Sequence, residues 1–258
     1  MSDRVMINEQ IVVDGICKIA RLAGDKILDI YHRDFAVQIK ADTSPLTEAD
    51  LAAHQIIVTG LAQLTPEIPV LSEEDADVDW SVRQKWQQFW LVDPLDGTKE
   101  FINKNGEFTV NIALIENGQP VLAVVYAPVL DKLYFTDKQY AYLSTAGKAR
   151  VRLQVKQPGR PLKVVGSRSH PSSDLADYLD KLGEFEMLSV GSSLKFGLIA
   201  EGLADLYPRL GPTMEWDTGA GHCIAEKAGA IVCQLDGQTL RYNQKESLLN
   251  PYFEVKTS

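Results

Sequence analysis

The stretch FWLVDPLDGT, residues 89–98, joins a short apolar run to a polar turn that holds two carboxylates. The run from Phe89 to Val92 is typical of a buried strand. Asp93 and Asp96 lie three positions apart across a proline, so on a regular strand they would face opposite sides. A turn at Pro94-Leu95 would bring both carboxylates to one point, with the Leu95 carbonyl between them. The stretch therefore predicts a set of hard oxygen ligands where a strand stops.

Gly97-Thr98 follows the second carboxylate directly. A short helix beginning there would point its free backbone N–H groups at the same place and hold a phosphate, and Gly97 would let the backbone come close. The Thr98 hydroxyl would orient a water molecule. Because no His or Cys stands at metal-ligand spacing nearby, the oxygen ligands favour Mg²⁺ or Mn²⁺ over Zn²⁺. Together these features describe metal-assisted hydrolysis of a phosphate ester.

Two more acidic groups share this setting. Glu73-Glu74-Asp75 follows the apolar pair Val70-Leu71 after one serine, and Asp217 stands at the expected start of a helix rich in small residues. For Glu73-Glu74-Asp75 alone, a solvated acidic loop is the simpler interpretation. The string D-P-x-D-G-T at 93–98 is too specific for a chance turn, so the functional interpretation depends on it.

The hydrophobic pattern predicts two N-terminal helices and then strands. The first helix carries apolar residues at helical spacing from Ile16 to Ile30; after a loop at 41–45, the second opens at a capping box at 47–50 and runs to about Leu64. Strands are expected at 37–40, 70–71 and 89–92, and then as a hairpin through the type I′ signal Asn117-Gly118. More short strands follow to about residue 155.

The pattern changes beyond Pro161. We expect strands at 162–165, 204–207 and 230–235 and helices at 173–182, 193–201 and 216–228. The mixture predicts packed α and β layers with an antiparallel sheet in the first part. The turn-forming segment Pro158-Gly159-Arg160-Pro161 predicts two lobes: an N-terminal α+β lobe, residues 1–160, and a C-terminal α/β lobe, residues 161–258, which completes the metal site and the substrate pocket.

Composition excludes several classes of protein. The chain of 258 residues has a formal net charge of −9, so it is a poor candidate for binding a nucleic acid polymer, which needs clustered Lys and Arg. A hydrophobic content of 45% excludes disorder, collagen and coiled coil. No apolar run approaches the roughly 20 residues of a membrane helix. Three cysteines without a CxxC pair favour reduced thiols and a cytoplasmic location, with loose attachment to the inner face of the membrane left open.

These motifs resemble the inositol monophosphatase superfamily, Mg²⁺-dependent and Li⁺-inhibited phosphatases. The resemblance rests on Glu73-Glu74, on D-P-L-D-G-T at 93–98 and on Trp216-Asp217, in the right order and over nearly the whole chain. It implies an α+β protein built as a layered αβαβα sandwich, the fold of inositol monophosphatase and fructose-1,6-bisphosphatase.

Local strings resemble one branch, the bacterial 3′(2′),5′-bisphosphate nucleotidases of the CysQ type. The strings are LSEED at 71–75, DGTKEF at 96–101, NGEFTVN at 105–111, SRSH at 167–170 and GSSLKF at 191–196. Inositol phosphatases usually carry Thr-Asn-Phe after D-G-T, where this chain has Lys99-Glu100-Phe101. The resemblance implies hydrolysis of 3′-phosphoadenosine 5′-phosphate to AMP and phosphate, which clears a by-product of sulfate assimilation.

The resemblance also implies site roles. Glu73, Asp93 and the Leu95 carbonyl would bind one Mg²⁺, and Asp93 would bridge to a second held by Asp96 and Asp217, with two or three ions in all and Mn²⁺ as a substitute. Thr98, backed by Asp50, would help Glu73 position the attacking water. The substrate would contact Gly97, Thr98 and Asp217 beside the metals.

A bisphosphate needs a second anion site in the C-terminal lobe. Arg168, His170 and Lys195 are the candidates, with Ser192 and Ser193 as hydroxyl donors. Gly191-Ser192-Ser193 before an apolar helix is equally well interpreted as a helix N-cap. Lys195 near a helix start opposes the helix dipole, which favours a functional role.

Three alternatives remain at this stage. An inositol monophosphatase or a related sugar phosphatase would use the same scaffold. A non-catalytic nucleotide or metal sensor would have no use for a positioned water, which argues against it. A dinucleotide oxidoreductase is disfavoured because no G-x-G-x-x-G follows a strand. The expected partner is a small nucleotide bisphosphate, and the sequence leaves monomer and homodimer open.

Overall fold

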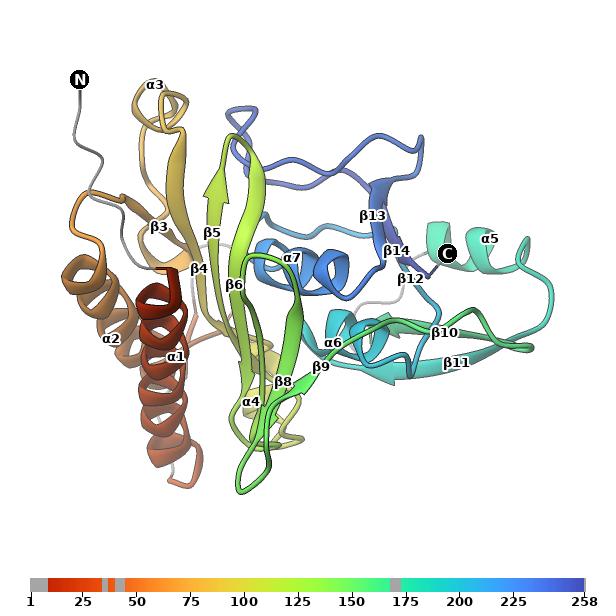
Figure 1. Cartoon of the computed structure of the whole chain (residues 1–258), viewed down its shortest axis with the longest axis horizontal. Coiled ribbons are helices and arrows are strands. Elements are labelled where there is room, and N and C mark those ends of the chain that lie inside the picture. Colours follow the sequence, from red (N-terminus) through yellow and green to blue (C-terminus); the bar gives the residue numbers. More distant parts are fainter. Residues whose placement is uncertain (1–8, 34–36, 40–44, 168–172, 258) are drawn as a thin grey trace.

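Five layers of helix and sheet make up the part of the chain that the computed structural model describes, residues 9–33, 37–39, 45–167 and 173–257 (Figure 1). Helices α1 (Glu9–Tyr31) and α2 (Glu48–Leu64) cover the outer face of a seven-stranded sheet. Helices α6 (Leu194–Ala200) and α7 (Gly219–Lys227) fill the space between this sheet and a five-stranded one. Helix α5 (Ser173–Leu179) lies beyond the second sheet. The predicted αβαβα sandwich is confirmed.

The seven-stranded sheet holds its strands in chain order. They are β3 (Val70–Ser72), β4 (Gln88–Asp96), β5 (Thr109–Glu116), β6 (Gln119–Ala127), β7 (Lys132–Thr136), β8 (Ala141–Thr145) and β9 (Val151–Arg152). Only β3 and β4 pair in parallel, so the expected antiparallel sheet is confirmed apart from this edge. The hairpin between β5 and β6 turns through Asn117 and Gly118, both at positive φ as a type I′ turn requires.

The five-stranded sheet has the order β11-β10-β12-β14-β13. Its strands are β10 (Leu162–Ser167), β11 (Phe185–Val190), β12 (Leu206–Arg209), β13 (Ile231–Gln234) and β14 (Phe253–Lys256). The short elements are β1 (Val37–Ile39), β2 (Pro45–Thr47), the 3₁₀ turn η1 (Glu73–Asp75), α3 (Trp80–Arg83) and α4 (Thr98–Ile102). The chain passes from one sheet to the other between Arg152 and Leu162, and the division into two lobes at 160/161 stays a prediction.

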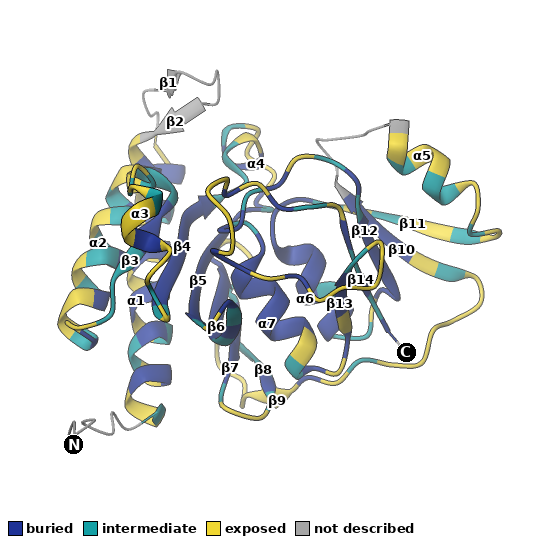
Figure 2. Cartoon of the chain, turned by 90° about the horizontal axis from the view of Figure 1, so that it is seen from above, coloured by how far each residue is buried: buried dark blue, intermediate teal, exposed yellow. Residues whose placement is uncertain are grey.

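Two apolar clusters hold the layers together. The first joins α1 and α2 to one face of the seven-stranded sheet, where Ile16, Ile27 and Ile30 of α1 are almost fully buried. The second joins the other face of that sheet to α6, α7 and the five-stranded sheet, so both sheets share it. Figure 2 shows the buried sheet and the buried α6 and α7, with exposed residues on the outer sides of α1 and α2. Strand β4, which carries Asp93 and Asp96, contributes residues to both clusters.

Several element bounds differ from those predicted. Strand β4 continues to Asp96 instead of stopping at Val92, and Pro45 belongs to β2 instead of a loop. Helix α7 begins at Gly219 instead of Trp216, because residues 214–218 form a turn in which Asp217 Oδ2 accepts the Met214 N–H at 2.8 Å. Strand β12 begins at Leu206 instead of Ala204. Strands β11 and β14 and helix α3 were not predicted.

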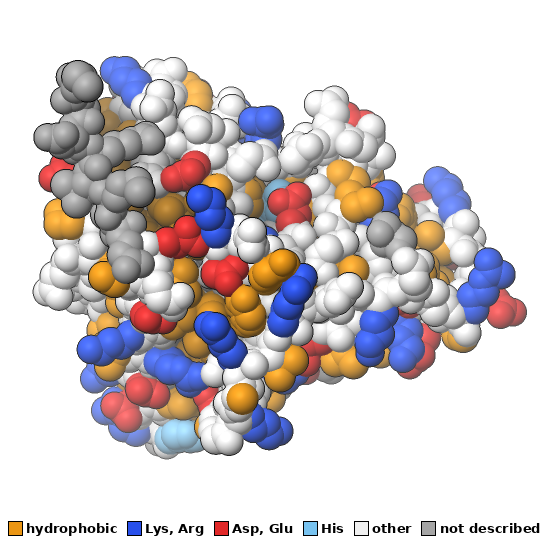
Figure 3. Space-filling model, in the orientation of Figure 1, with side chains coloured by type: hydrophobic (Ala, Val, Ile, Leu, Met, Phe, Trp, Pro, Cys, Tyr) orange, Lys and Arg blue, Asp and Glu red, His pale blue; other side chains and the backbone are white. Residues whose placement is uncertain are grey.

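The surface mixes charges of both signs. Figure 3 shows Lys and Arg side chains interspersed with Asp and Glu on the face seen in Figure 1. In the described part of the chain, no helix is both long enough and apolar enough to cross a bilayer. Against this mixed surface, a group of converging carboxylates is a local feature that needs its own explanation.

Candidate active site

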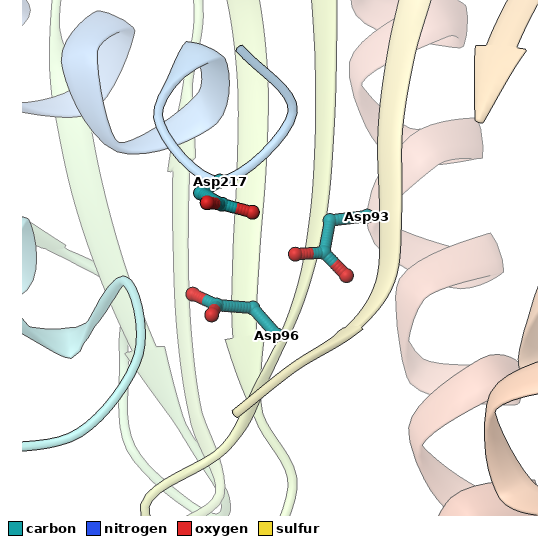
Figure 4. A group of neighbouring side chains, drawn as sticks. All are labelled: Asp93, Asp96 and Asp217. Carbon is teal, nitrogen blue, oxygen red and sulfur yellow. The ribbon is translucent and has the colours of Figure 1, made fainter. Parts of the chain in front are cut away.

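Three carboxylates meet between the first sheet and the start of α7. Asp93 and Asp96 come from β4 and Asp217 from the turn before α7, and a carboxylate oxygen from each lies within 4.8 Å of the others. Figure 4 shows the three side chains pointing toward one another. Asp93 is 1% exposed and the other two are half-buried. The predicted convergence of Asp93 and Asp96 is therefore confirmed, and Asp217 joins them.

A β-bulge produces this convergence. Asp93 pairs with Asn111 and Asp96 with Thr109, so three steps along β4 match two steps along β5. The extra residue breaks the alternation that would point the two side chains to opposite faces. The Leu95 N–H donates to Asp93 Oδ1 at 3.1 Å, which holds the bulge closed. The expected turn at Pro94-Leu95 is thus a bulge inside a strand.

The cluster is electrostatically unfavourable on its own. Burial, and then the charges of Glu73, Asp96, Asp217 and Asp50, raise the pKa of Asp93 well above its usual value. Burial and the charges of Asp96 and Glu73 raise the pKa of Asp217 to about 8. The pKa of Asp96 is raised by burial, against the opposing effect of Lys195. Such repulsion is relieved by protons or by a bound cation.

The predicted catalytic residues lie around this cluster. Asp50 is fully buried in the first turn of α2, and Glu73 is half-buried in η1. Both are close enough for their charges to raise the pKa of Asp93. Thr98 is the first residue of α4, directly after Gly97, whose φ of 94° starts the helix. The expected short helix at Thr98 is confirmed; the roles of these residues stay predictions.

The 191–195 segment borders the cluster from the α6 side. Lys195 is 5% exposed, and its Nζ donates to the Ser192 carbonyl at 2.5 Å. Burial lowers the pKa of Lys195 to about 8, although the charges of Asp96, Glu100 and Asp217 act in the opposite direction.

Ser193 occupies the N-cap position of α6, but its side chain makes no capping hydrogen bond. Its Oγ donates instead to the Asp217 carbonyl at 2.8 Å, so the expected N-cap position is confirmed without a side-chain capping bond. Arg168 and His170 lie outside the described residues.

Sequence reasoning missed Asn111 as a site residue. Its Nδ2 donates to Ser193 Oγ at 3.0 Å and, at 3.4 Å, to Asp96 Oδ2, so one buried amide links the carboxylate cluster to the 191–195 segment. Asn111 stands inside the NGEFTVN string, but its spacing of 15 and 82 residues from its two partners leaves no local signal for this role.

The inositol monophosphatase family pattern matches residues 8–256 of the chain. The chain belongs to the inositol monophosphatase family. Members of this family are metal-dependent phosphatases, and the oxygen cluster at Asp93, Asp96 and Asp217 lies where two layers of the family's fold meet.

Curated relatives within the family carry a more specific name. The chain is 55% identical over 246 residues to the "3′(2′),5′-bisphosphate nucleotidase CysQ" of Salmonella typhimurium, covering 95% of this chain and 99% of that protein. The protein of the same name from Escherichia coli strain K12 is 54% identical over the same shares. The similarity therefore extends over nearly the whole length of each protein.

Solved structures of the family share the fold. The CysQ crystal structure from Bacteroides thetaiotaomicron superposes with a TM-score of 0.83 at 43% identity, covering 95% of this chain and 97% of that one. An IMPase from Thermotoga maritima superposes with a TM-score of 0.76 at 23% identity, covering 95% and 91%, which supports the fold alone.

The residues present fit a divalent cation. The donors are carboxylate oxygens, which hard cations prefer. Burial raises the pKa of all three carboxyl groups; the charges of neighbouring carboxylates raise those of Asp93 and Asp217 further, and Lys195 opposes the rise at Asp96. A metal-dependent site is therefore the arrangement that these residues explain best.

Proposed function

We propose that this chain is a Mg²⁺-dependent 3′(2′),5′-bisphosphate nucleotidase, which hydrolyses the 3′-phosphate of 3′-phosphoadenosine 5′-phosphate to give AMP and phosphate. The observation that carries the proposal is that the 93/96/217 carboxylate cluster and a buried lysine, Lys195, occur together in a chain 55% identical to a nucleotidase of this name. The carboxylate cluster suits metal ions and the reacting phosphate, and Lys195 suits a second phosphate.

Mg²⁺ held by Glu73, Asp93, the Leu95 carbonyl, Asp96 and Asp217 would lower the pKa of a water molecule and neutralise the charge of the phosphate. Glu73 and Thr98 would hold the attacking water in line with the scissile bond, and Asp50 would orient the Thr98 hydroxyl. The Gly97 and Thr98 backbone, at the start of α4, would place the phosphate oxygens. These roles are part of the proposal.

The second phosphate would lie against the 191–195 segment. The Ser192 Oγ is buried and has no hydrogen-bond partner among the described residues, so it is available to a ligand oxygen. The Lys195 ammonium supplies the charge that a phosphate requires. Arg168 and His170 are proposed to complete this subsite, and the protein's oligomeric state and location in the cytoplasm stay predictions.

An inositol monophosphatase is the second candidate, because it would use the same metal site. Its substrate carries one phosphate and would not use a second anion subsite. The Lys99-Glu100-Phe101 and GSSLKF strings, and the 55% identity to a nucleotidase of the CysQ name, favour the bisphosphate substrate.

The deciding experiment measures phosphate release from 3′-phosphoadenosine 5′-phosphate and from inositol 1-phosphate at equal concentrations, each with Mg²⁺ and with EDTA. We expect the nucleotide to be hydrolysed faster by orders of magnitude and EDTA to stop the reaction. Preference for inositol phosphate would keep the metal site and overturn the assignment of the second subsite. No turnover of either compound with Mg²⁺ would favour a binding protein without catalysis.

A further inference from the structure

The NGEFTVN string at 105–111 resembles one branch of the family, and the proposed function assigns none of its residues a role. In the structure, the string runs from a turn after α4 into strand β5. Two of its side chains reach across to the 191–195 segment, which lies more than 80 residues away in sequence.

Glu107 makes the first of these contacts. Its Oε2 accepts the Gly191 N–H at 2.8 Å, a hydrogen bond strengthened by the negative charge of the carboxylate. The turn that presents Glu107 is itself fixed, because the Glu107 N–H donates to Asn105 Oδ1 at 2.9 Å and Gly106 has a φ of 78°. Glu107 therefore binds the Gly191 backbone from a turn whose conformation is itself fixed.

Gly191 also packs tightly against this turn. A Cβ atom there would lie 2.6 Å from Glu100 Cγ and 2.7 Å from the Glu107 carbonyl oxygen, too close for any side chain. The backbone of the 191–195 segment can approach α4 and the 105–107 turn only because residue 191 is glycine. These contacts fix the distance between the 191–195 segment and strand β4, which carries Asp93 and Asp96 and leads into α4.

Ser192, the next residue, has a strained backbone. Its φ of 46° is in the left-handed region, which non-glycine residues adopt only when their surroundings hold them there. Glu107 holds the residue before it, and the Lys195 ammonium holds its carbonyl. These two bonds keep the unpartnered Ser192 hydroxyl and the Lys195 ammonium in one fixed arrangement.

Asn111 makes the second contact. By bonding to Ser193 Oγ and Asp96 Oδ2, it fixes the far side of the same segment to a carboxylate of the metal cluster. The segment is therefore attached to the metal-site elements at both Gly191 and Ser193.

We propose that the 105–111 string sets the distance between the metal cluster and the second anion subsite, with Glu107 as the positioning residue that makes the enzyme selective for a nucleotide bearing two phosphates. The inference rests on the proposed function. Glu107 would act through its hydrogen bond to Gly191.

The test compares KM and kcat for 3′-phosphoadenosine 5′-phosphate and for adenosine 3′-monophosphate, both with Mg²⁺. Glu107→Ala is expected to raise KM for the bisphosphate about tenfold or more, because a charge-assisted hydrogen bond is lost. The KM for the monophosphate and the kcat for both substrates should change less than about twofold. Glu107→Gln keeps an acceptor oxygen and should restore most of the selectivity. Glu67→Ala removes an exposed glutamate elsewhere and is the matched control.

Gly191→Ala provides a second route, because its Cβ would displace the segment without removing a charge. It should lower selectivity in the same direction. Equal losses on both substrates in Glu107→Ala, or a wild type with the same KM for both, would overturn the inference and leave the nucleotidase activity standing.

A binding arm separates this inference from the proposed function. If the wild type hydrolyses neither nucleotide, the proposed function fails, and calorimetry of adenosine 5′-monophosphate with Mg²⁺ still tests the positioning role. Binding about tenfold weaker in Glu107→Ala than in the wild type and Glu107→Gln would support it. Equal binding in all three proteins would overturn it.

Discussion

Asp93 lies at the centre of the candidate site, and its replacement separates function from stability. Asp93→Asn is expected to reduce phosphate release to below about 1% of the wild type, because the site loses a carboxylate proposed to hold Mg²⁺. In EDTA the variant should melt no lower than the wild type, since the substitution removes a buried carboxyl group whose ionised form its neighbours repel. Retained turnover with a normal melting curve would contradict the metal assignment.

Lys195 is the residue on which the choice of substrate depends. Lys195→Gln is expected to raise KM for the bisphosphate about tenfold or more and to affect the monophosphate less, because a charged hydrogen bond to the second phosphate is lost. Lys227→Gln is the control, since the Lys227 ammonium is also held by backbone carbonyls, of Val121 and Asp137, but by none from the site. Steady-state kinetics with both nucleotides measures the selectivity of the two variants and of the wild type. A selectivity unchanged in Lys195→Gln would remove lysine from the second subsite.

At the scale of elements, the sequence predicts what depends on local chemistry. Helix α1 follows from its apolar spacing, and the hairpin from Asn117-Gly118. Strand β14, Phe253–Lys256, alternates apolar and polar residues, a local pattern that favours a strand. Edge strand β11 is only partly buried and has no such alternation. The bulge in β4 could not be predicted, because it depends on the register against β5.

The junction of β4 and α4 allows a matched test of backbone conformation. Gly97 has a φ of 94°, and a Cβ there would lie 3.2 Å from the Glu107 carbonyl oxygen; Gly147 has a φ of 68° with nothing within 4 Å. Gly147→Ala should cost about 1 kcal/mol with full activity, from the φ alone. Gly97→Ala should cost about 1–3 kcal/mol and reduce kcat by displacing Thr98. Urea unfolding and kinetics measure both. Equal effects of the two variants would mean that the 97/98 geometry is not needed for catalysis.

At the scale of the whole molecule, the site exists only because layers meet. Asp93 and Asp96 come from the first sheet, Asp217 from the turn before α7, and Lys195 from α6 (Figure 1). Motif strings predicted the carboxylates, because D-P-L-D-G-T at 93–98 and Trp216-Asp217 can be recognised from the sequence alone. They could not predict Asn111 or Glu107 as positioning residues, whose partners are brought close only by the packing of α6 against the first sheet.

A cation bound at this junction would connect two layers and would link metal binding, pH and global stability. The pKa of Asp217 is about 8 in the folded metal-free protein and near 3.8 when unfolded. Between these values the folded state binds more protons than the unfolded state, so the free energy of unfolding falls as pH rises from about 4 to about 8. The raised pKa values of Asp93 and Asp96 act in the same direction.

Mg²⁺ should reverse this trend, because it binds the ionised carboxylates and competes with protons. We expect Mg²⁺ to raise the melting temperature more at pH 8 than at pH 6, by at least about 3 °C, a shift that corresponds to roughly 1 kcal/mol for a chain of this size. Calorimetry in EDTA and in Mg²⁺ at both pH values measures it. Asp217→Asn should melt with less pH dependence in EDTA and gain less from Mg²⁺. The same Mg²⁺ shift at pH 6 and pH 8 would mean that the carboxylates are already ionised without metal, and the electrostatic basis of the site would fail.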